Sequence, residues 1–272
     1  MVMNVDISSF KALFERIHIR YGYDFTNYAP DSLLRRTTLF MKSLNIDWWD
    51  AFATRILEDE YTFEEFIKFI SVTVTEMFRD PSFFLSLREK VIPSLTKYPV
   101  IKIWIAGCAT GEEAYSVAIL LKEKNLLTRS IIYATDINQN SLQIAKAGIY
   151  PISAIKAYTS NYLKAGGEKA FSTYYTAKYD LTTFDRSLRD NIVFAPHNLA
   201  VDEAFNEFQM IVCRNVLIYF NPTLQDRVIN LFYDSLDPFG FLGLGGKESL
   251  LFSSKREYFQ EVDRKERIFM KK

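Results

Sequence analysis

The strongest constraint on the fold is the alternation of buried strands and amphipathic helices that begins after Pro99. Continuous apolar runs, typical of strands covered on both faces, alternate with segments whose apolar residues recur at helical spacing. This pattern predicts a mainly parallel sheet joined by crossover helices, which is an α/β fold. The expected strands are 101–106, 130–136, 191–196, 208–213, 240–246 and 267–272, and the expected helices are 112–124, 141–148 and 224–236.

Two other regions depart from this alternation. The stretch 151–189 is too long for a loop and predicts an inserted small helix and β-hairpin. In the N-terminal part of the chain, apolar residues at helical spacing predict an all-helical region. Its helix starts include Asp31 and Thr62, whose capping-box partner is Glu65. The expected helices are 10–17, 32–44, 48–57, 62–78 and 81–95.

The two patterns divide the chain into domains. Two prolines in the segment 93–99 cannot continue a helix, so we place a boundary there. The predicted organisation is an N-terminal helical domain at 1–95 and an α/β domain at 99–272, with a small subdomain inserted at about 151–189. Sheets of this kind bind ligands at the carboxyl ends of their strands.

Composition narrows the possible functions. Lysine plus arginine number 33, as do aspartate plus glutamate, so no overall field attracts nucleic acid or an anionic membrane. The N-terminus lacks a basic region followed by an apolar run, and no apolar segment reaches the roughly 18 residues of a membrane span. Cys108, Cys213, His18 and His197 are too few for a zinc or histidine-rich metal centre. We expect a cytoplasmic protein without membrane insertion, metal or nucleic-acid partner.

The stretch IWIAGCATGEEAYSVAILL passes from the first expected strand through Gly107 and Gly111 into a helix. A phosphate-binding loop needs a lysine after its last glycine, but here Glu112 and Glu113 follow. These carboxylates would also repel the pyrophosphate of a dinucleotide. A positively charged nucleoside without phosphate fits better, and S-adenosylmethionine meets both conditions. We predict that Gly107 lets the ligand approach and that Glu112 faces it, whereas Glu113 only stabilises the helix start.

Asp136 ends the second expected strand, in YATDIN. A carboxylate at this place in such a sheet accepts hydrogen bonds from the ribose hydroxyls of a bound adenosine. An aspartate there can also cap the helix that follows. Together with the glycine turn, Asp136 favours ribose binding.

Several stretches in the same order resemble the CheR family of chemotaxis receptor methyltransferases, which transfer a methyl group from S-adenosylmethionine to receptor glutamates. The resemblance extends from about Thr73 to Ser249. It implies a class I S-adenosylmethionine-dependent methyltransferase with a Rossmann-like sheet and S-adenosylhomocysteine as product. The matching stretches are TVTEMFRDPSFF, AGCATGEEAYS, YATDINQNSLQIAKAGIY, FAPHNL, IVCRNVLIYF and GGKESL.

The resemblance also implies site residues. The family pattern Asn-x-Thr-x-Phe-Phe-Arg, which closes over the cofactor, corresponds to the segment from Thr73, in place of the leading Asn, to Arg79. Arg79 and Tyr219 are the implied catalytic residues, although the sequence IYF around Tyr219 also suits core packing. With the residues argued above, the predicted cofactor set is Thr73, Thr75, Arg79, Gly107, Glu112, Asp136, Asn198, Leu199, Arg214 and Asn215.

The chemistry of the acceptor supports this set. A glutamate with a pKa near ~4.3 is ionised at neutral pH, so its methylation needs no general base. The guanidinium of Arg79 could align the carboxylate through paired hydrogen bonds, although an arginine near a helix end can also be a surface residue. Methyltransferases that act on base amines place Asn/Asp-Pro-Pro-Tyr/Phe where this chain has Cys213-Arg214-Asn215-Val216, which disfavours a nucleic-acid substrate.

The expected partners are cytoplasmic helices of membrane chemoreceptors or related sensory proteins, and we expect a monomer. Arg35, Arg36 and Lys42 could meet an acidic receptor helix, and a solvated helix face explains these charges equally well. Some relatives hold a receptor tail on the inserted subdomain through a glycine-containing loop. The stretch YLKAGGEKAFSTYY gives no clear match to that loop, and its Gly166 and Gly167 also suit a simple turn. The alternative function is a noncatalytic S-adenosylmethionine-binding signalling or scaffold module, which would not need the two catalytic residues.

Overall fold

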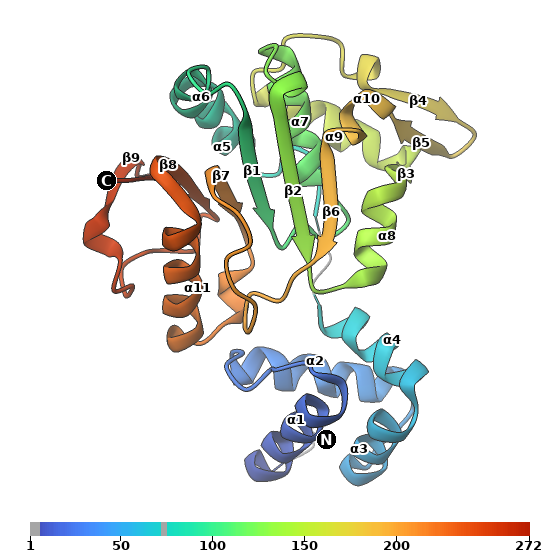
Figure 1. Cartoon of the computed structure of the whole chain (residues 1–272). Helices are drawn as coiled ribbons and strands as arrows, with labels where there is room; N and C mark the ends of the chain where they lie inside the picture. Colours follow the sequence, from blue (N-terminus) through green and yellow to red (C-terminus); the bar gives the residue numbers. More distant parts are fainter. Residues whose placement is uncertain (1–5, 72–74) are drawn as a thin grey trace.

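The computed structural model describes residues 6–71 and 75–272. In this part of the chain, a helical bundle stands below a large sheet with helices packed on it, and a small sheet lies to one side (Figure 1). No helix in the described residues is long and apolar enough to cross a bilayer. The bundle consists of α1 (Ile7–Tyr21), α2 (Pro30–Ser43), α3 (Trp49–Glu58) and α4 (Glu60–Ile70).

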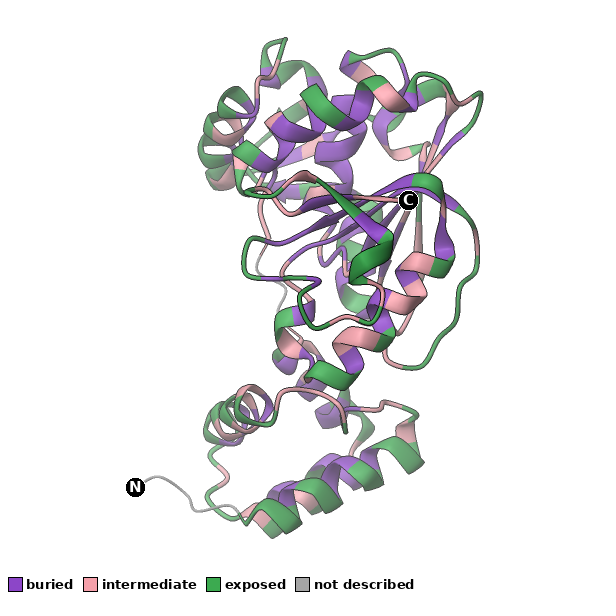
Figure 2. Cartoon of the chain, turned by 90° about the vertical axis from the view of Figure 1, so that its left-hand side faces the viewer, coloured by how far each residue is buried: buried purple, intermediate pink, exposed green. Residues whose placement is uncertain are grey.

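The bundle is held together by aromatic side chains on the inner faces of its helices, while the outer faces are exposed (Figure 2). Phe52 and Phe66 are fully buried and meet edge to face at 5.7 Å. The predicted start of α4 at Thr62 is wrong. The extended residue Asp59 caps the helix, because its carboxylate accepts hydrogen bonds from the backbone N–H groups of Tyr61 and Thr62.

The large sheet confirms the predicted class I, Rossmann-like α/β fold. Its strand order is β6-β2-β1-β7-β8-β10-β9; the first five strands are parallel, and β10 runs antiparallel to both neighbours. The sequence did not predict β9, in which only the first residue is buried, so no apolar run marks it. The strands are β1 (Ile101–Ala106), β2 (Ser130–Asp136), β6 (Ile192–Pro196), β7 (Phe208–Cys213), β8 (Leu236–Leu244), β9 (Phe259–Asp263) and β10 (Ile268–Lys271).

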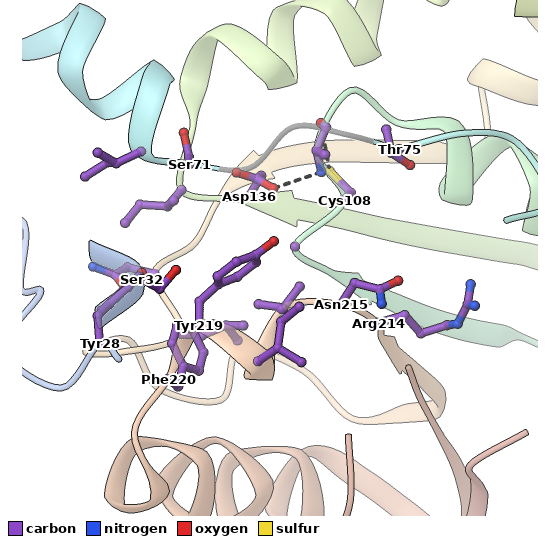
Figure 3. Close-up of a pocket in the computed structure, with 18 of the residues that line it drawn as sticks. Tyr28, Ser32, Ser71, Thr75, Cys108, Asp136, Arg214, Asn215, Tyr219 and Phe220 are labelled. Atoms are coloured by element: carbon purple, nitrogen blue, oxygen red, sulfur yellow. Dashed lines mark hydrogen bonds between the residues drawn. The ribbon is translucent and has the colours of Figure 1, made fainter. Parts of the chain in front are cut away.

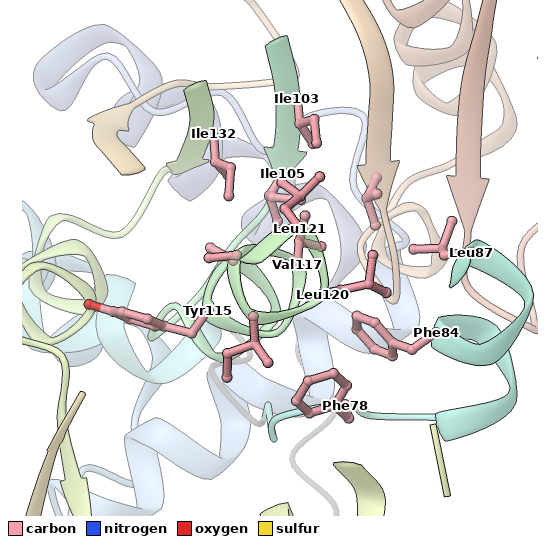
Figure 4. Close-up of a cluster of buried hydrophobic side chains, with 14 of the residues drawn as sticks. Phe78, Phe84, Leu87, Ile103, Ile105, Tyr115, Val117, Leu120, Leu121 and Ile132 are labelled. Carbon is pink, nitrogen blue, oxygen red and sulfur yellow. The ribbon is translucent and has the colours of Figure 1, made fainter. Parts of the chain in front are cut away.

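Helices cover both faces of this sheet. On one face, Val117, Leu120 and Leu121 of α7 pack against the isoleucines of β1 (Figure 4). On the other face, Trp104 of β1 meets Phe232 of α11 at 5.3 Å. The helical segments of this domain are α5 (Pro81–Ser86), η1 (Leu87–Val91), α6 (Ile92–Leu95), α7 (Glu112–Glu123), η2 (Leu127–Arg129), α8 (Gln139–Ala147), α10 (Arg186–Arg189), η5 (Leu217–Tyr219), α11 (Pro222–Ser235) and η6 (Arg256–Tyr258).

The segment before β1 also packs on the sheet. Phe83, Phe84 and Leu87 belong to the same buried cluster as α7 and β1. Pro93 lies at the start of α6, where its missing N–H is tolerated, so the helical segment continues past the first proline to Leu95. The domain boundary between 95 and 99 stays a prediction.

The small sheet has the strand order β3-β5-β4. The turn between β4 and β5 consists of Tyr179 and Asp180 and contains no glycine. Buried Glu123 of α7 ties this region to the large sheet, because its carboxylate accepts hydrogen bonds from Arg88 and Tyr174 at 2.5 and 2.9 Å. The elements are β3 (Ile149–Pro151), η3 (Ile152–Ala154), α9 (Ile155–Lys164), η4 (Phe171–Tyr174), β4 (Tyr175–Lys178) and β5 (Leu181–Phe184).

The bundle contacts the sheet domain near the carboxyl ends of the parallel strands, toward which the arrowheads of β1, β2 and β6 point (Figure 1). The N–H of Ala29 donates to the carbonyl of Tyr219 at 2.8 Å, and the N–H of Asn221 donates to the carbonyl of Asn27 at 2.9 Å. We call these two hydrogen bonds the bundle bridge.

Candidate functional site

A pocket lies between the bundle and the carboxyl ends of the parallel strands (Figure 3). Most residues predicted to bind the cofactor or act in catalysis meet there. Thr73 lies outside the described residues, and Glu112 is absent from the described residues that line the pocket. The predicted residues in the lining are Thr75, Arg79, Gly107, Asp136, Asn198, Leu199, Arg214, Asn215 and Tyr219.

The turn between β1 and α7 forms one wall. Gly107 adopts a φ of +76°, and a Cβ there would lie 2.4 Å from Cγ2 of Val216. Glycine is therefore required for packing against the loop after β7, in addition to the predicted approach of a ligand. Gly111, with a φ of +97°, begins α7 at a point where a Cβ would lie 2.8 Å from Cβ of Ala145.

Asp136 stands at the end of β2 with its carboxylate fixed by the backbone. Oδ2 accepts from the N–H of Ala109 at 2.8 Å (Figure 3), and Oδ1 accepts from the N–H of Asn138 at 2.8 Å. The helix cap is Asn138, whose side chain accepts from the N–H of Ser141. The alternative role of Asp136 as a helix cap is therefore excluded. Burial raises the pKa of Asp136 even though these N–H groups favour the charged form.

The two acids at the start of α7 lie in different places. Glu113 lines the pocket and accepts a hydrogen bond from Arg214 at 2.7 Å. Glu112 is 4% exposed, and its carboxylate accepts from the hydroxyls of Thr110 and Tyr158 at 2.7 and 3.2 Å. Burial raises the pKa of Glu112. Of these two glutamates, Glu113 is therefore the one at the pocket, although the sequence analysis assigned it only a role at the helix start.

Arg214 connects three segments of the site. Its guanidinium donates to Glu113, to Asp80 at 2.6 Å and to the carbonyl of Arg79 at 3.1 Å. It also lies over the ring of Phe83, with 4.2 Å to the centroid. The side chains of Arg214 and Glu113 are only 3% and 12% exposed, so their ion pair is largely shielded from water, whereas that of Asp80 is 55% exposed. Arg214 therefore fixes the position of the segment that contains Arg79.

The backbone around Arg79 is strained. Phe78 and Asp80, which flank it, have φ values of 53° and 55°, in the left-handed region that such residues rarely adopt. The N–H of Phe78 donates to the hydroxyl of Ser116 at 2.9 Å, and the side chain of Asn161 donates to the carbonyl of Met77 at 3.1 Å. Backbone strain of this kind persists where surrounding contacts enforce it, and it gathers at functional sites.

Tyr219 lies between the sheet and the bundle. Its carbonyl accepts the bundle-bridge hydrogen bond from Ala29, and Arg36 of α2 lies over its ring at 5.7 Å. Burial raises the pKa of Tyr219, and the charges of Arg36 and Arg79 oppose part of that rise. Tyr219 therefore lines the pocket and also packs against the hydrophobic cluster between the sheet and α11.

Glu248, which the sequence placed only within the matching stretch GGKESL, organises the loop after β7. Its Oε1 accepts from the N–H groups of Val216 and Leu217 at 2.8 Å each, and its Oε2 from that of Gly245 at 2.6 Å. Asn215, which precedes them, has a φ of 61°. Burial raises the pKa of Glu248, while the N–H groups partly counter the rise.

The bundle supplies a wall that the sequence did not predict. Its residues approach the strand ends only in the folded chain, so no local pattern marks them. Of the charges on α2 that were considered for receptor contact, Arg36 lines the pocket. The other bundle residues in the lining are Phe25, Tyr28, Ala29, Ser32, Leu33, Ile67 and Ile70.

Comparison with known proteins identifies the family to which the chain belongs. The family model described as the CheR methyltransferase SAM binding domain matches residues 73–268, and that described as the CheR methyltransferase all-alpha domain matches residues 8–71. The chain belongs to the CheR methyltransferase family. CheR proteins bind S-adenosylmethionine through the first of these domains, and the chain is an S-adenosylmethionine-dependent methyltransferase of the chemotaxis type.

Relatives from several bacteria support this assignment to the CheR family. The chain is 48% identical to the "Putative methyltransferase Cher3" of Pseudomonas putida, over 98% of each chain. It is 31% identical to the "Chemotaxis protein methyltransferase" of Listeria innocua, over 85% of this chain and 86% of the relative. Among solved structures, the N-methyltransferase NodS of Bradyrhizobium japonicum with S-adenosyl-l-homocysteine matches with a TM-score of 0.34 and 15% identity, covering 62% of each chain.

Proposed function

We propose that this CheR protein acts in the cytoplasm and methylates glutamate side-chain carboxylates of chemoreceptors or related signalling proteins. One observation supports this function above all: the acids Asp136 and Glu113 and the guanidinium of Arg79 line the same pocket. Acids suit a sulfonium methyl donor, whereas a guanidinium suits a carboxylate acceptor. The pocket therefore offers a suitable partner to each of the two reactants.

The lining fits S-adenosylmethionine. Asp136 can accept the ribose hydroxyls, because each carboxylate oxygen accepts one hydrogen bond from the backbone and retains further lone pairs. Asn198 and Leu199 line the pocket and are assigned to the adenine, and Glu113, in place of Glu112, adds a carboxylate that is paired with Arg214. Thr75 and Asn215 offer further polar groups, and the role of Thr73 stays a prediction.

When bound, S-adenosylmethionine supplies a methyl group on a positively charged sulfur, which an ionised carboxylate can accept without proton transfer. Arg79 is assigned to orient the acceptor carboxylate, and Tyr219 to pack beside the reacting groups. A general base is not needed. His197 also lines the pocket; its Nε2 lies 3.3 Å from the carbonyl oxygen of Glu203, and no step of the proposed transfer uses its ring.

The deciding experiment incubates the protein with radiolabelled S-adenosylmethionine and membranes that contain chemoreceptors. We expect label that is released by base, as from a methyl ester. Arg79→Ala should lose turnover with a smaller loss of cofactor binding. Cofactor binding without base-labile label on any of several receptors would leave the noncatalytic module as the better explanation, and absence of cofactor binding would exclude both.

A further inference from the structure

A second hollow borders the cofactor pocket. The two hollows share a wall at the place where we expect methyl transfer, and the residues that line both are Arg79, Arg214, Asn215 and Ile218. Ile218 is 38% exposed, which leaves apolar surface available at this wall. The second hollow is formed by the segment before α5, the start of α5, the segments after β7 and β8, and Glu266, and none of its described lining residues belongs to the bundle.

The charges around the second hollow are unequally paired. The acid Asp80 accepts from Arg214 at 2.6 Å, and the acid Glu266 accepts from the hydroxyl of Ser82 at 3.0 Å. Lys247 also lines this hollow, and it makes no hydrogen bond or ion pair with residues 6–71 or 75–272. An exposed ammonium group is thus left available for an external anion.

The loop that contains Lys247 is fixed to the site. The next residue, Glu248, accepts from the N–H of Gly245 at 2.6 Å, and its own N–H donates back to the carbonyl of Gly245 at 2.8 Å. The same carboxylate holds the N–H groups of Val216 and Leu217. The backbone of Lys247 is therefore fixed relative to Asn215 and Tyr219, while its long side chain can still adjust.

We propose that the second hollow receives the acceptor protein and that Lys247 pairs with a second carboxylate on it. In a helical acceptor, an acidic residue one turn away from the methylated glutamate lies about 5–6 Å from it, so both side chains can reach the same face of the enzyme. The first carboxylate meets Arg79 and the second meets Lys247. This inference rests on the proposed function, and it assigns Lys247 to the selection of glutamates that have an acidic neighbour.

The test uses the soluble cytoplasmic fragment of a chemoreceptor that the wild-type protein labels, with radiolabelled S-adenosylmethionine as donor. Rates are measured against acceptor concentration for wild type, Lys247→Gln and Lys247→Arg. The control is Lys164→Gln, which removes the same charge from an exposed position on α9 that lines neither hollow. Calorimetry measures cofactor affinity in parallel.

We expect Lys247→Gln to raise the KM for the acceptor up to about fivefold, as for a partly exposed ion pair, with kcat and cofactor affinity within about twofold. Lys247→Arg should restore the KM, and Lys164→Gln should not change it. A further acceptor variant has the acidic residues one turn away from the methylated glutamate changed to glutamine. This change should raise the KM measured with wild type but not the KM measured with Lys247→Gln, because that enzyme variant already lacks the ammonium group that pairs with those acids.

Three results would each overturn the inference and leave the proposed function intact. They are an unchanged KM in Lys247→Gln, an equal rise of KM in Lys164→Gln, and equal sensitivity of wild type and Lys247→Gln to the acceptor's neighbouring acids. If the wild-type protein puts no base-labile label on any acceptor, the proposed function fails and the inference fails with it. Base-labile label from the wild-type protein therefore distinguishes failure of this inference from failure of the proposed function.

Discussion

Asp136 keeps its carboxylate in place through the N–H groups of Ala109 and Asn138, whether or not a ligand is bound. Because burial raises its pKa above the usual 3.8, acidification protonates it earlier than an ordinary aspartate. A protonated carboxyl attracts a cationic cofactor less. Cofactor affinity should therefore fall as pH drops through the raised pKa, by up to about tenfold per pH unit below it.

The effect of Asp136 on stability has the opposite sign. A group whose pKa is raised by folding stabilises the folded state below its unfolded pKa, and this contribution is lost as pH rises through the folded pKa. Protonation of Asp136 should thus weaken binding without unfolding the protein. Calorimetric titration across pH, with thermal melting alongside, checks both expectations. Asp136→Asn should show weak binding without this pH dependence, and a similar acid loss in that variant would contradict the assignment.

Glu113 and Glu112 form a matched pair for a second test. Glu113→Gln should reduce cofactor affinity by about tenfold, since it removes a negative charge at the pocket and weakens the ion pair with Arg214. Glu112→Gln should keep affinity within about twofold, because the glutamine oxygen can still accept from Thr110 and its NH2 group can donate to the hydroxyl of Tyr158. Equilibrium binding of S-adenosylhomocysteine measures both. A larger loss of affinity in Glu112→Gln than in Glu113→Gln would instead support the prediction from the sequence that Glu112 faces the cofactor.

At the scale of elements, the loops after β7 and β8 depend on Glu248. Glu248→Ala would leave the N–H groups of Val216, Leu217 and Gly245 without their acceptor. We expect a loss of about 3 kcal/mol or more in unfolding free energy, measured by urea denaturation. Glu261→Gln, at an exposed position on β9, should stay within about 0.5 kcal/mol. An equal, small loss in both would show that the loops do not need this anchor.

The sequence predicted the elements best where burial makes a continuous pattern. The fully buried strand β7 was placed from its apolar run alone, and β1 and β2 were placed to the residue. The start of α4 failed because Thr62 and Asp59 are both good capping residues and only the folded backbone selects between them. Likewise, Glu112 and Glu113 are adjacent in sequence, and the rotation of α7 decides which one reaches the pocket.

At the scale of the whole molecule, the contribution of the bundle bridge to the pocket can be tested by a substitution that fits the backbone of Ala29. Ala29 has a φ of −62° and a ψ of 112°, which proline can adopt, so Ala29→Pro removes the N–H that donates to Tyr219. We expect cofactor affinity to fall severalfold while helical content by circular dichroism is unchanged. Ala29→Ser keeps the N–H and should bind normally. Equal affinity in wild type and Ala29→Pro would show that the bridge does not support the pocket.

The whole-molecule arrangement was the part that sequence predicted least. The helical domain and the sheet domain were each expected, and the resemblance supplied most residues at the strand ends. The wall formed by Tyr28, Ser32 and Arg36 was not expected, because it depends on how two separately patterned regions pack. Contacts between distant segments, such as Ala29 with Tyr219, leave no periodicity in the chain.

The bundle bridge also has a consequence for the timing of the catalytic cycle. A nucleoside held between the bundle and the strand ends must leave past residues that belong to both domains. Transfer of a methyl group to an ionised carboxylate requires no proton movement, so chemistry need not be the slow event. We expect departure of S-adenosylhomocysteine past these residues to set the turnover rate.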